Sequence, residues 1–296
     1  MPQIIDNPGD QSCSLPEAIE ALADIGFDPR DDASTAEAAK WLRKLTNNRE
    51  FLGRILLDRL AGRNEDMVES GYGPQAIVLS PLRGGMFLRA NIWPAEHDLC
   101  FQNSGAKTFV YGVPHDHNFS FLTSGYLGPG YRSDYFEYEY EDVCGYAGEQ
   151  VNLRFVERSA LHEGKLMLYR AHRDVHSQLP PGSLSVSLNV MHVDPAQAWC
   201  DQYGFDLESK RITRVLSPNA SEVFLRAAVA SGTSEALDYA GWIGESHPSE
   251  RLRLASFEAR AGQLSDPGER DDLWRDGELC GSRMVANVAR EKRASF

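Results

Sequence analysis

The chain has 296 residues, of which 42% are hydrophobic and 25% charged, and its formal net charge is −13. These fractions are ordinary for a soluble globular protein, while the negative charge argues against nucleic acid as a partner, because such binding depends on clustered lysine and arginine. No apolar run approaches the ~20 residues that span a bilayer, and the first ten residues do not resemble a signal peptide. We therefore expect a cytoplasmic protein with no membrane partner.

Residues 1–70 are predicted to form an N-terminal helical region. Ser14 and Glu17 have the spacing of a capping box, as do Ser34 and Glu37, and this pattern marks the start of a helix. A third amphipathic run covers residues 50–60, and its apolar positions recur at helical spacing. The five cysteines lie far apart and form no C-x-x-C pair, which predicts free thiols.

Residues 75–200 change character and are predicted to be all β. Short runs rich in aromatic and β-branched residues alternate with glycine and proline turns, at residues 75–81, 86–93, 107–113, 119–123, 134–140, 151–157, 165–171 and 184–191. Several short strands with regular turn signals are typical of a sandwich or small barrel. We expect an α+β protein whose centre is an antiparallel β-barrel of the jelly-roll type, with a pocket at one end.

Residues 215–296 return to helical patterns and are predicted to form a C-terminal helical region. Amphipathic units cover residues 222–231, 234–243 and 248–261, and their spacing and residue pattern are similar to those of a helix pair in an α-solenoid. About three repeats are needed for a stable array, so one or two units do not establish one. The acidic, turn-rich stretch 265–281 is expected to be a surface or partly disordered segment.

The most informative motif is His115-Asp116-His117. Residues i and i+2 of an extended strand face the same side, so the two imidazoles should point together and Asp116 away. Neutral imidazole is the commonest metal ligand, and two of them can bind one ion. His172 and His176 are candidates for a third ligand, because the strand that follows them can return beside the first motif.

An H-x-H motif followed about 60 residues later by a single histidine, on strands joined by Gly/Pro turns, resembles the cupin superfamily. The usual cupin glutamate, four or five residues after the second histidine, is replaced here by Phe121 or Leu122. This departure is similar to the thiol dioxygenases, a cupin group with three histidines and no glutamate. Their first motif also reads HDH, and the resemblance makes His176 the third ligand beside His115 and His117.

The same group carries an aromatic-x-Arg on an early strand, matched here by Phe87-Leu88-Arg89, and a strand after the third histidine, matched by 187–191. Asn189 stands where the group has a further histidine that does not bind the metal, Met191 replaces its tyrosine, and Leu122 lies where its cross-linked cysteine would be expected. The resemblance covers about 110 of the 296 residues and neither helical region. The resemblance therefore supports inferences about the fold and the metal site better than an inference about the substrate.

The resemblance implies a mononuclear non-haem Fe(II) oxygenase that uses O2 on a small-molecule or peptide substrate. Imidazole ligands also suit zinc, manganese or nickel. Arg89 would pair with a substrate carboxylate, Asn189 could orient a ligand, and Tyr111, like Tyr126 and Tyr169, could line the pocket. Whether the protein forms a homodimer is left open.

Other interpretations remain open at this stage. The H-x-D pairs at 172–174 and 192–194 match the ligand pattern of 2-oxoglutarate oxygenases, and Glu137 or Glu139 could supply a fourth ligand. The same site could instead serve an O2-independent isomerase or lyase, or a non-catalytic module that binds a metal or small ligand.

Overall fold

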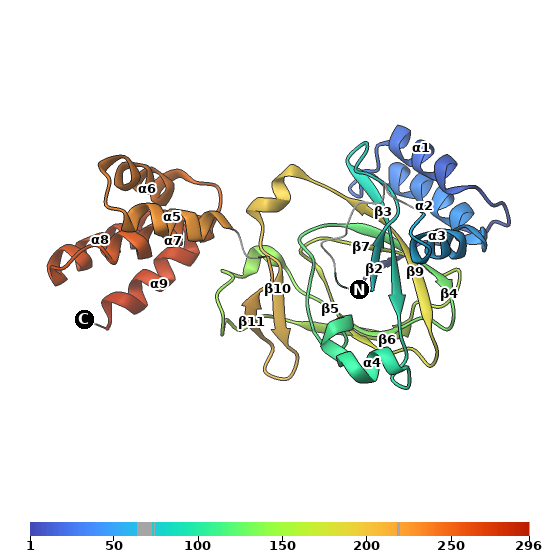
Figure 1. Cartoon of the computed structure of the whole chain (residues 1–296). Coiled ribbons are helices and arrows are strands. Elements are labelled where there is room, and N and C mark those ends of the chain that lie inside the picture. Colours follow the sequence, from blue (N-terminus) through green and yellow to red (C-terminus); the bar gives the residue numbers. More distant parts are fainter. Residues whose placement is uncertain (64–72, 74, 218–219, 296) are drawn as a thin grey trace. The chain divides into compact units, whose positions relative to one another are not determined.

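Two antiparallel sheets form the part of the molecule that carries the histidines (Figure 1). The computed structural model describes residues 1–63, 73, 75–217 and 220–295. It divides into two compact units, the first comprising Met1–Tyr140, Gln150–Gln197 and Gly204–Arg211, and the second Glu141–Glu149, Ala198–Tyr203 and Ile212–Phe296. Each unit is described separately below.

The larger sheet of the first unit has six strands. Its order is β1 (Gln3–Ile4), β7 (Leu166–Tyr169), β4 (Phe121–Leu127), β9 (Ser185–His192), β3 (Met86–Trp93) and β2 (Ala76–Val78). The long central pair β3–β9 places Arg89 opposite Asn189. Because side chains alternate across a strand, one face of this pair presents polar side chains to the cavity described below, and the other presents Leu88 and Leu188 to a hydrophobic core.

A second sheet has three strands in the order β6 (Arg154–Ala160), β5 (Arg132–Glu137) and β8 (Asp174–Leu179), and a further pair joins β10 (Tyr203–Asp206) to β11 (Arg211–Val215). The predicted closed barrel is not observed: among the described residues neither larger sheet pairs its edge strands with the other. Residues of β3, β4 and β9 nevertheless line the same cavity as residues of β8. The cavity therefore lies between the two sheets, although the sheets do not join into a closed barrel.

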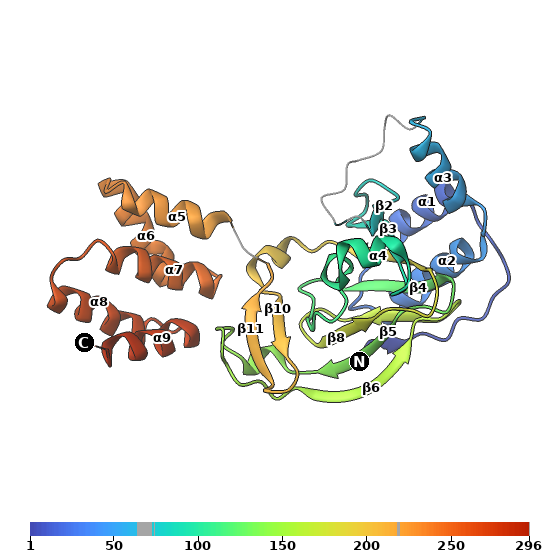
Figure 2. The same cartoon turned by 60° about the horizontal axis from the view of Figure 1, so that its bottom comes forward.

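The helices α1 (Leu15–Ile25) and α2 (Asp32–Asn47) cover the outer face of the larger sheet, and α3 (Phe51–Leu60) follows them (Figure 2). Their buried Leu22 and Leu42 share one core with Leu88 of β3. The predicted capping box of Ser14 and Glu17 is confirmed. The second predicted box is wrong, because the side chain of Asp31 caps α2 instead, as expected of an N-cap carboxylate.

The chain between β3 and β4 departs from the predicted strand at 107–113. It contains α4 (Leu99–Ser104) and a 3-10 turn, Ala106–Phe109, which ends at Val110 with a φ of 63°. A left-handed β-branched residue is unfavourable and interrupts an extended run. Four strands of the structure were also not predicted, namely β1, β8, β10 and β11.

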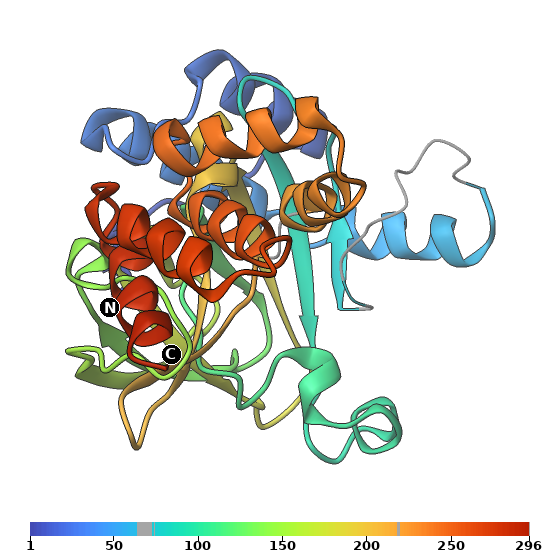
Figure 3. The same cartoon turned by 90° about the vertical axis from the view of Figure 1, so that its left-hand side faces the viewer.

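The second unit contains five helices among its described residues (Figure 3): α5 (Ala220–Ala230), α6 (Ser234–Ser246), α7 (Glu250–Ala261), α8 (Pro267–Leu279) and α9 (Arg283–Arg293). Helix α7 packs against the other four. The expectation of a partly disordered segment at 265–281 is wrong, because Asp266 caps α8 and the helix buries Leu273 and Trp274. No helix in the described part of the chain has the length and apolar character needed to cross a membrane.

Candidate metal centre

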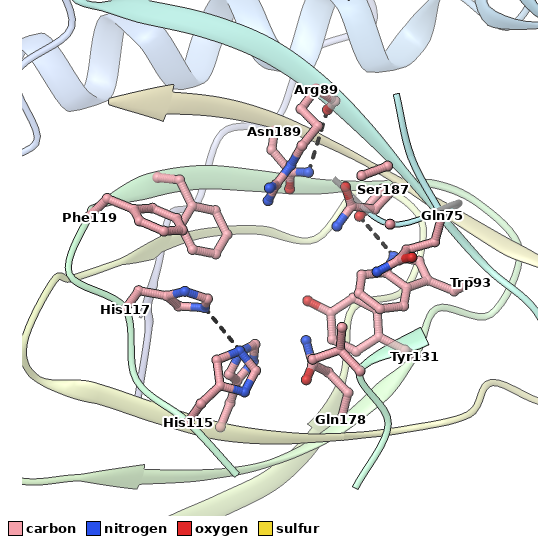
Figure 4. A pocket seen from close by; sticks show the side chains of 16 residues that line it. Gln75, Arg89, Trp93, His115, His117, Phe119, Tyr131, Gln178, Ser187 and Asn189 are labelled. Carbon is pink, nitrogen blue, oxygen red and sulfur yellow. Dashed lines mark hydrogen bonds between the residues drawn. The ribbon is translucent and has the colours of Figure 1, made fainter. Parts of the chain in front are cut away.

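Three imidazoles converge in the first unit, and we call them the histidine cluster: His115, His117 and His176 (Figure 4). His115 and His117 lie on an extended segment just before β4, and His176 lies on β8. The backbone N–H of His115 donates to the carbonyl of His176 at 3.0 Å, and the reverse bond is 2.9 Å long. Such a mutual pair fixes two residues directly opposite each other, so the backbone itself brings these two ligands together.

The alternation predicted for the H-x-H motif is confirmed. His115 and His117 face the cluster, whereas Asp116 points away and accepts a hydrogen bond of 2.6 Å from the Tyr138 hydroxyl. The carbonyl of His117 accepts from the backbone N–H of His172 at 2.8 Å. This bond connects the motif to the turn before β8.

The three Nε2 atoms lie close enough to share one ion. The distance is 3.1 Å from His117 to His176 and 3.2 Å from His176 to His115. Ligand nitrogens ~2.1 Å from a metal are separated by ~3.0 Å at a right angle and by ~3.4 Å at a tetrahedral angle. These two separations lie between those values, and all three ligand atoms lie within 4.8 Å of one another, so the cluster fits one metal ion.

Two imidazoles have a hydrogen-bond partner at the outer nitrogen, Nδ1. Nδ1 of His115 lies 2.6 Å from the Val113 carbonyl, which can only accept, so this nitrogen donates. Nδ1 of His176 lies 3.2 Å from the Tyr169 hydroxyl, which itself donates to Tyr135. With a proton on Nδ1 of both rings, the two Nε2 atoms would direct lone pairs at each other, and a cation between them would remove this repulsion.

Protonation is not an alternative source of positive charge in the cluster. Burial lowers the pKa of His115 from its ordinary value, and burial lowers the pKa values of His117 and His176 further. His117 packs against Phe119 and Phe121 with ring centroids 4.8 and 5.1 Å away, and its Nδ1 is buried without a hydrogen-bond partner among the described residues. All three imidazoles are therefore neutral at pH 7, which is the form that binds metal.

The cluster opens into a cavity of about 230 Å³. Its described lining comprises Gly73, Gln75, Ala76, Arg89, Asn91, Trp93, Val110, His115, His117, Phe119, Phe121, Tyr131, His176, Gln178, Ser187 and Asn189. Figure 4 shows the imidazoles on one side of this space, and Arg89 with Asn189 on another. A metal with three protein ligands would keep open coordination positions toward the cavity.

The structure brings two of the three predicted non-metal site residues to this cavity. Arg89 is 8% exposed and Asn189 is 2% exposed, and both line it. The Asn189 amide donates to the backbone carbonyl of Arg89 at 3.4 Å. Tyr111 is not among the described lining residues; its hydroxyl donates to the Pro94 carbonyl at 2.9 Å, and a catalytic role for it stays a prediction.

Several alternative ligands are placed elsewhere. Glu137 forms ion pairs with the N-terminal amine, Arg154 and Arg170, and these contacts lower its pKa to about 2 despite partial burial. Asp174 accepts from Arg170 at 2.6 Å. Among the described residues, no carboxylate joins the three histidines in the candidate metal group. The fourth-ligand and H-x-D interpretations are therefore not supported.

A layer of tyrosines behind the cluster was only partly foreseen. Tyr169 was considered as a pocket residue, but its hydroxyl lies behind His176, 3.4 Å from Tyr131 and 3.3 Å from Tyr135. Tyr131 and Gln178, which line the cavity, were not singled out. Gln178 lies two residues after His176 on β8, so the period of two would have found it once β8 was recognised.

Comparisons with known proteins give only distant likenesses. No family model matches the sequence, and no curated protein matches it. Similar solved structures include a cupin domain from Bordetella pertussis Tohama I (11% identity, TM-score 0.25), which covers 43% of this chain and 100% of its own. The match to a salicylate 1,2-dioxygenase from Pseudaminobacter salicylatoxidans (10% identity, TM-score 0.25) covers 48% of this chain and 33% of the dioxygenase chain. The match to a prolyl 4-hydroxylase from Phytophthora capsici (12% identity, TM-score 0.26) covers 95% of this chain and 82% of the hydroxylase chain. Scores of this size carry no functional assignment, so the chemistry of the site rests on its own residues.

Proposed function

We propose that this protein is a mononuclear non-haem Fe(II) oxygenase of the cupin type, with a ligand set like that of the thiol dioxygenases. The histidine cluster would hold the metal, and a small anionic molecule would be the substrate. The observation that carries the proposal is the convergence of three neutral imidazoles, by Nε2, on one buried point that opens into a cavity. Iron(II) bound there would supply the capacity to activate O2.

The ligand set supports a substrate that carries negative charge. Three neutral imidazoles leave a divalent ion with its full charge, so the open positions would favour anionic donors. Arg89 lines the same cavity and is buried. Its guanidinium could hold a substrate carboxylate by two parallel hydrogen bonds, which would keep the substrate oriented toward the cluster.

The aromatic side chains of the cavity would exclude water from the reacting end. Phe119 and Phe121 pack around His117, and Phe121 stacks on Tyr169 with a centroid distance of 4.5 Å. The Tyr169 hydroxyl lies 3.2 Å from Nδ1 of His176 and would orient this ring. The side chains around the ligands are therefore held in place by packing and hydrogen bonds, as a metal site requires.

Metal content is the first test of this proposal. Purified wild type, His115→Ala, His117→Ala and His176→Ala would be compared by elemental analysis after anaerobic addition of Fe(II). His97→Ala is a matched control, because His97 is exposed and lies outside the cluster. We expect about one iron per wild-type and control chain and a loss of iron in each cluster variant that keeps its circular dichroism spectrum.

Oxygen uptake then separates the oxygenase from other metal-dependent activities. With iron bound, a panel of small carboxylates and thiols should include one that accelerates O2 consumption, and Arg89→Met should raise the KM for that substrate more than it lowers kcat. Absence of stoichiometric metal would refute the proposed site. A bound metal with turnover that does not need O2 would instead indicate an isomerase or lyase.

A further inference from the structure

Three carboxamides that line the cavity have side-chain oxygens without a hydrogen-bond partner in the described part of the chain. The side-chain oxygens of Gln75, Asn91 and Gln178 are buried and have no hydrogen-bond partner among the described residues. Gln75 is 8% exposed and Gln178 is 5% exposed. A buried acceptor without a partner is unfavourable, so a ligand that forms hydrogen bonds with these carboxamides would be stabilised in the cavity.

These carboxamides lie where a molecule near the metal would touch them. Gln178 and His176 project from the same face of β8, because they are two residues apart. Figure 4 shows Gln178 pointing into the same space as the imidazoles, with Gln75 farther along the wall. Asn91 is two residues after Arg89 on β3 and faces the same way.

Neighbouring polar side chains of the cavity already have protein partners. The Ser187 hydroxyl accepts from the indole N–H of Trp93 at 3.0 Å, and the Asn189 amide donates to the backbone of β3. The contrast separates polar groups that serve the fold from the three carboxamides, which line the cavity and whose side-chain oxygens have no partner among the described residues.

The chemistry of a carboxamide selects the kind of group that it can bind. A carboxamide both accepts and donates, and a hydroxyl group does the same, so a hydroxyl can pair with it in either orientation. An ammonium group can only donate and needs a carboxylate to offset its charge, and the described lining residues include no aspartate or glutamate. The cavity of about 230 Å³ corresponds to roughly eight water volumes, which suits a compact ligand.

We infer that the cavity binds a small hydroxylated carboxylate, whose hydroxyl groups pair with Gln75, Asn91 and Gln178 while its anionic end faces Arg89 and the metal. This inference rests on the proposed function for the metal and narrows its substrate class to hydroxy acids. It makes Gln178 a specificity-determining residue. A site built around hydrogen bonds discriminates strongly against an analogue that lacks them, because its polar groups then remain unpaired.

Three six-carbon acids test the inference: gluconate with hydroxyls, hexanoate without them, and 6-aminohexanoate with an ammonium group. Their binding to the full chain would be measured by isothermal titration calorimetry, without O2, with Zn(II) bound and also without metal. We expect gluconate to bind at least roughly 10-fold more tightly than either analogue in both states. Because the carboxamides do not depend on the metal, this ranking can hold even where the iron proposal fails.

Two variants test whether the carboxamides cause the preference for gluconate. Gln178→Leu should weaken gluconate roughly 10-fold, as expected for a lost buried hydrogen bond, and leave hexanoate unchanged. Asn91→Leu should do the same and serves if the first variant does not fold, while Gln102→Leu, at an exposed position of α4, should change neither. Equal binding of gluconate and hexanoate, tighter binding of 6-aminohexanoate, binding of none of the three, or equal losses for both acids in Gln178→Leu would overturn the inference.

Discussion

The Tyr169 hydroxyl is the group behind the cluster whose removal gives the clearest quantitative test. Tyr169→Phe deletes one oxygen atom and keeps the ring, which stacks on Phe121 at 4.5 Å. His176 then loses the partner 3.2 Å from its Nδ1. Because Tyr169 is fully buried, we expect no solvent group to replace this partner.

The magnitude follows from the outer hydrogen bond. A buried hydrogen bond contributes ~1 kcal/mol, and outer partners of metal-bound histidines typically change metal affinity by ~10–100-fold. The partner here is a neutral phenol, since burial raises the pKa of Tyr169 well above its ordinary value. We therefore expect the lower end of the range, a loss of about 10-fold in metal affinity.

Competition with a chromophoric chelator for Co(II) would measure the affinity of wild type, Tyr169→Phe and Tyr135→Phe. Tyr135 is the control, because its hydroxyl lies 3.3 Å from that of Tyr169, whereas the hydroxyl next to Nδ1 of His176 belongs to Tyr169. The visible spectrum of bound Co(II) should also shift in Tyr169→Phe. Equal affinities and spectra in the three proteins would refute the view that Tyr169 positions His176.

The remaining predictions concern stability. In the metal-free protein, burial lowers the pKa of His172 to about 4 and depresses the pKa values of the cluster, so only the unfolded chain gains these protons as the pH falls below ~6.5. The free energy of unfolding should therefore decrease from pH ~6.5 toward pH ~4; urea titrations that give a constant value would contradict this. Gly130→Ala should destabilise by more than ~1 kcal/mol, because Gly130 has a φ of 79° and a Cβ there would overlap the Leu161 carbonyl. Gly53→Ala, with open space in α3, should instead stabilise by ~0.5–1 kcal/mol. Thermal unfolding should therefore show a lower Tm for the first variant and a higher Tm for the second, and equal shifts in both would contradict this. Tyr111→Phe should lower the free energy of unfolding by ~1 kcal/mol and leave the metal content unchanged. A loss of metal would instead support a role for Tyr111 at the site.

The sequence reveals those parts of the fold that are built from apolar alternation. Strands β3 and β9 were predicted because one face of each packs against Leu22 and Leu42 of the N-terminal helices. Strand β8 was missed because its inward residues are His176 and Gln178, which face a polar cavity and give no hydrophobic pattern. Helix α8 was missed for a related reason, since most of its residues are polar and it buries few side chains.

The candidate site was recognisable to the extent that its residues are rare and close in sequence. The H-x-H motif identified two ligands, and a family resemblance selected His176 as the third. The sequence did not predict that the three carboxamides share a cavity. Gln75, Asn91 and Gln178 come from different segments, and glutamine and asparagine form no motif with a distinctive spacing. Only the packing of the two sheets places these residues around one cavity.

The mutual backbone hydrogen bonds between His115 and His176 bear on the order in which folding and metal binding occur. Both bonds belong to the polypeptide itself, so they form when the chain folds and require no ion. Two of three ligand positions are therefore set before metal arrives, and little ordering entropy would remain for the ion to offset. The chain is expected to fold first and to bind a metal afterwards, so metal supply would change how many sites are occupied and not how much folded protein is present.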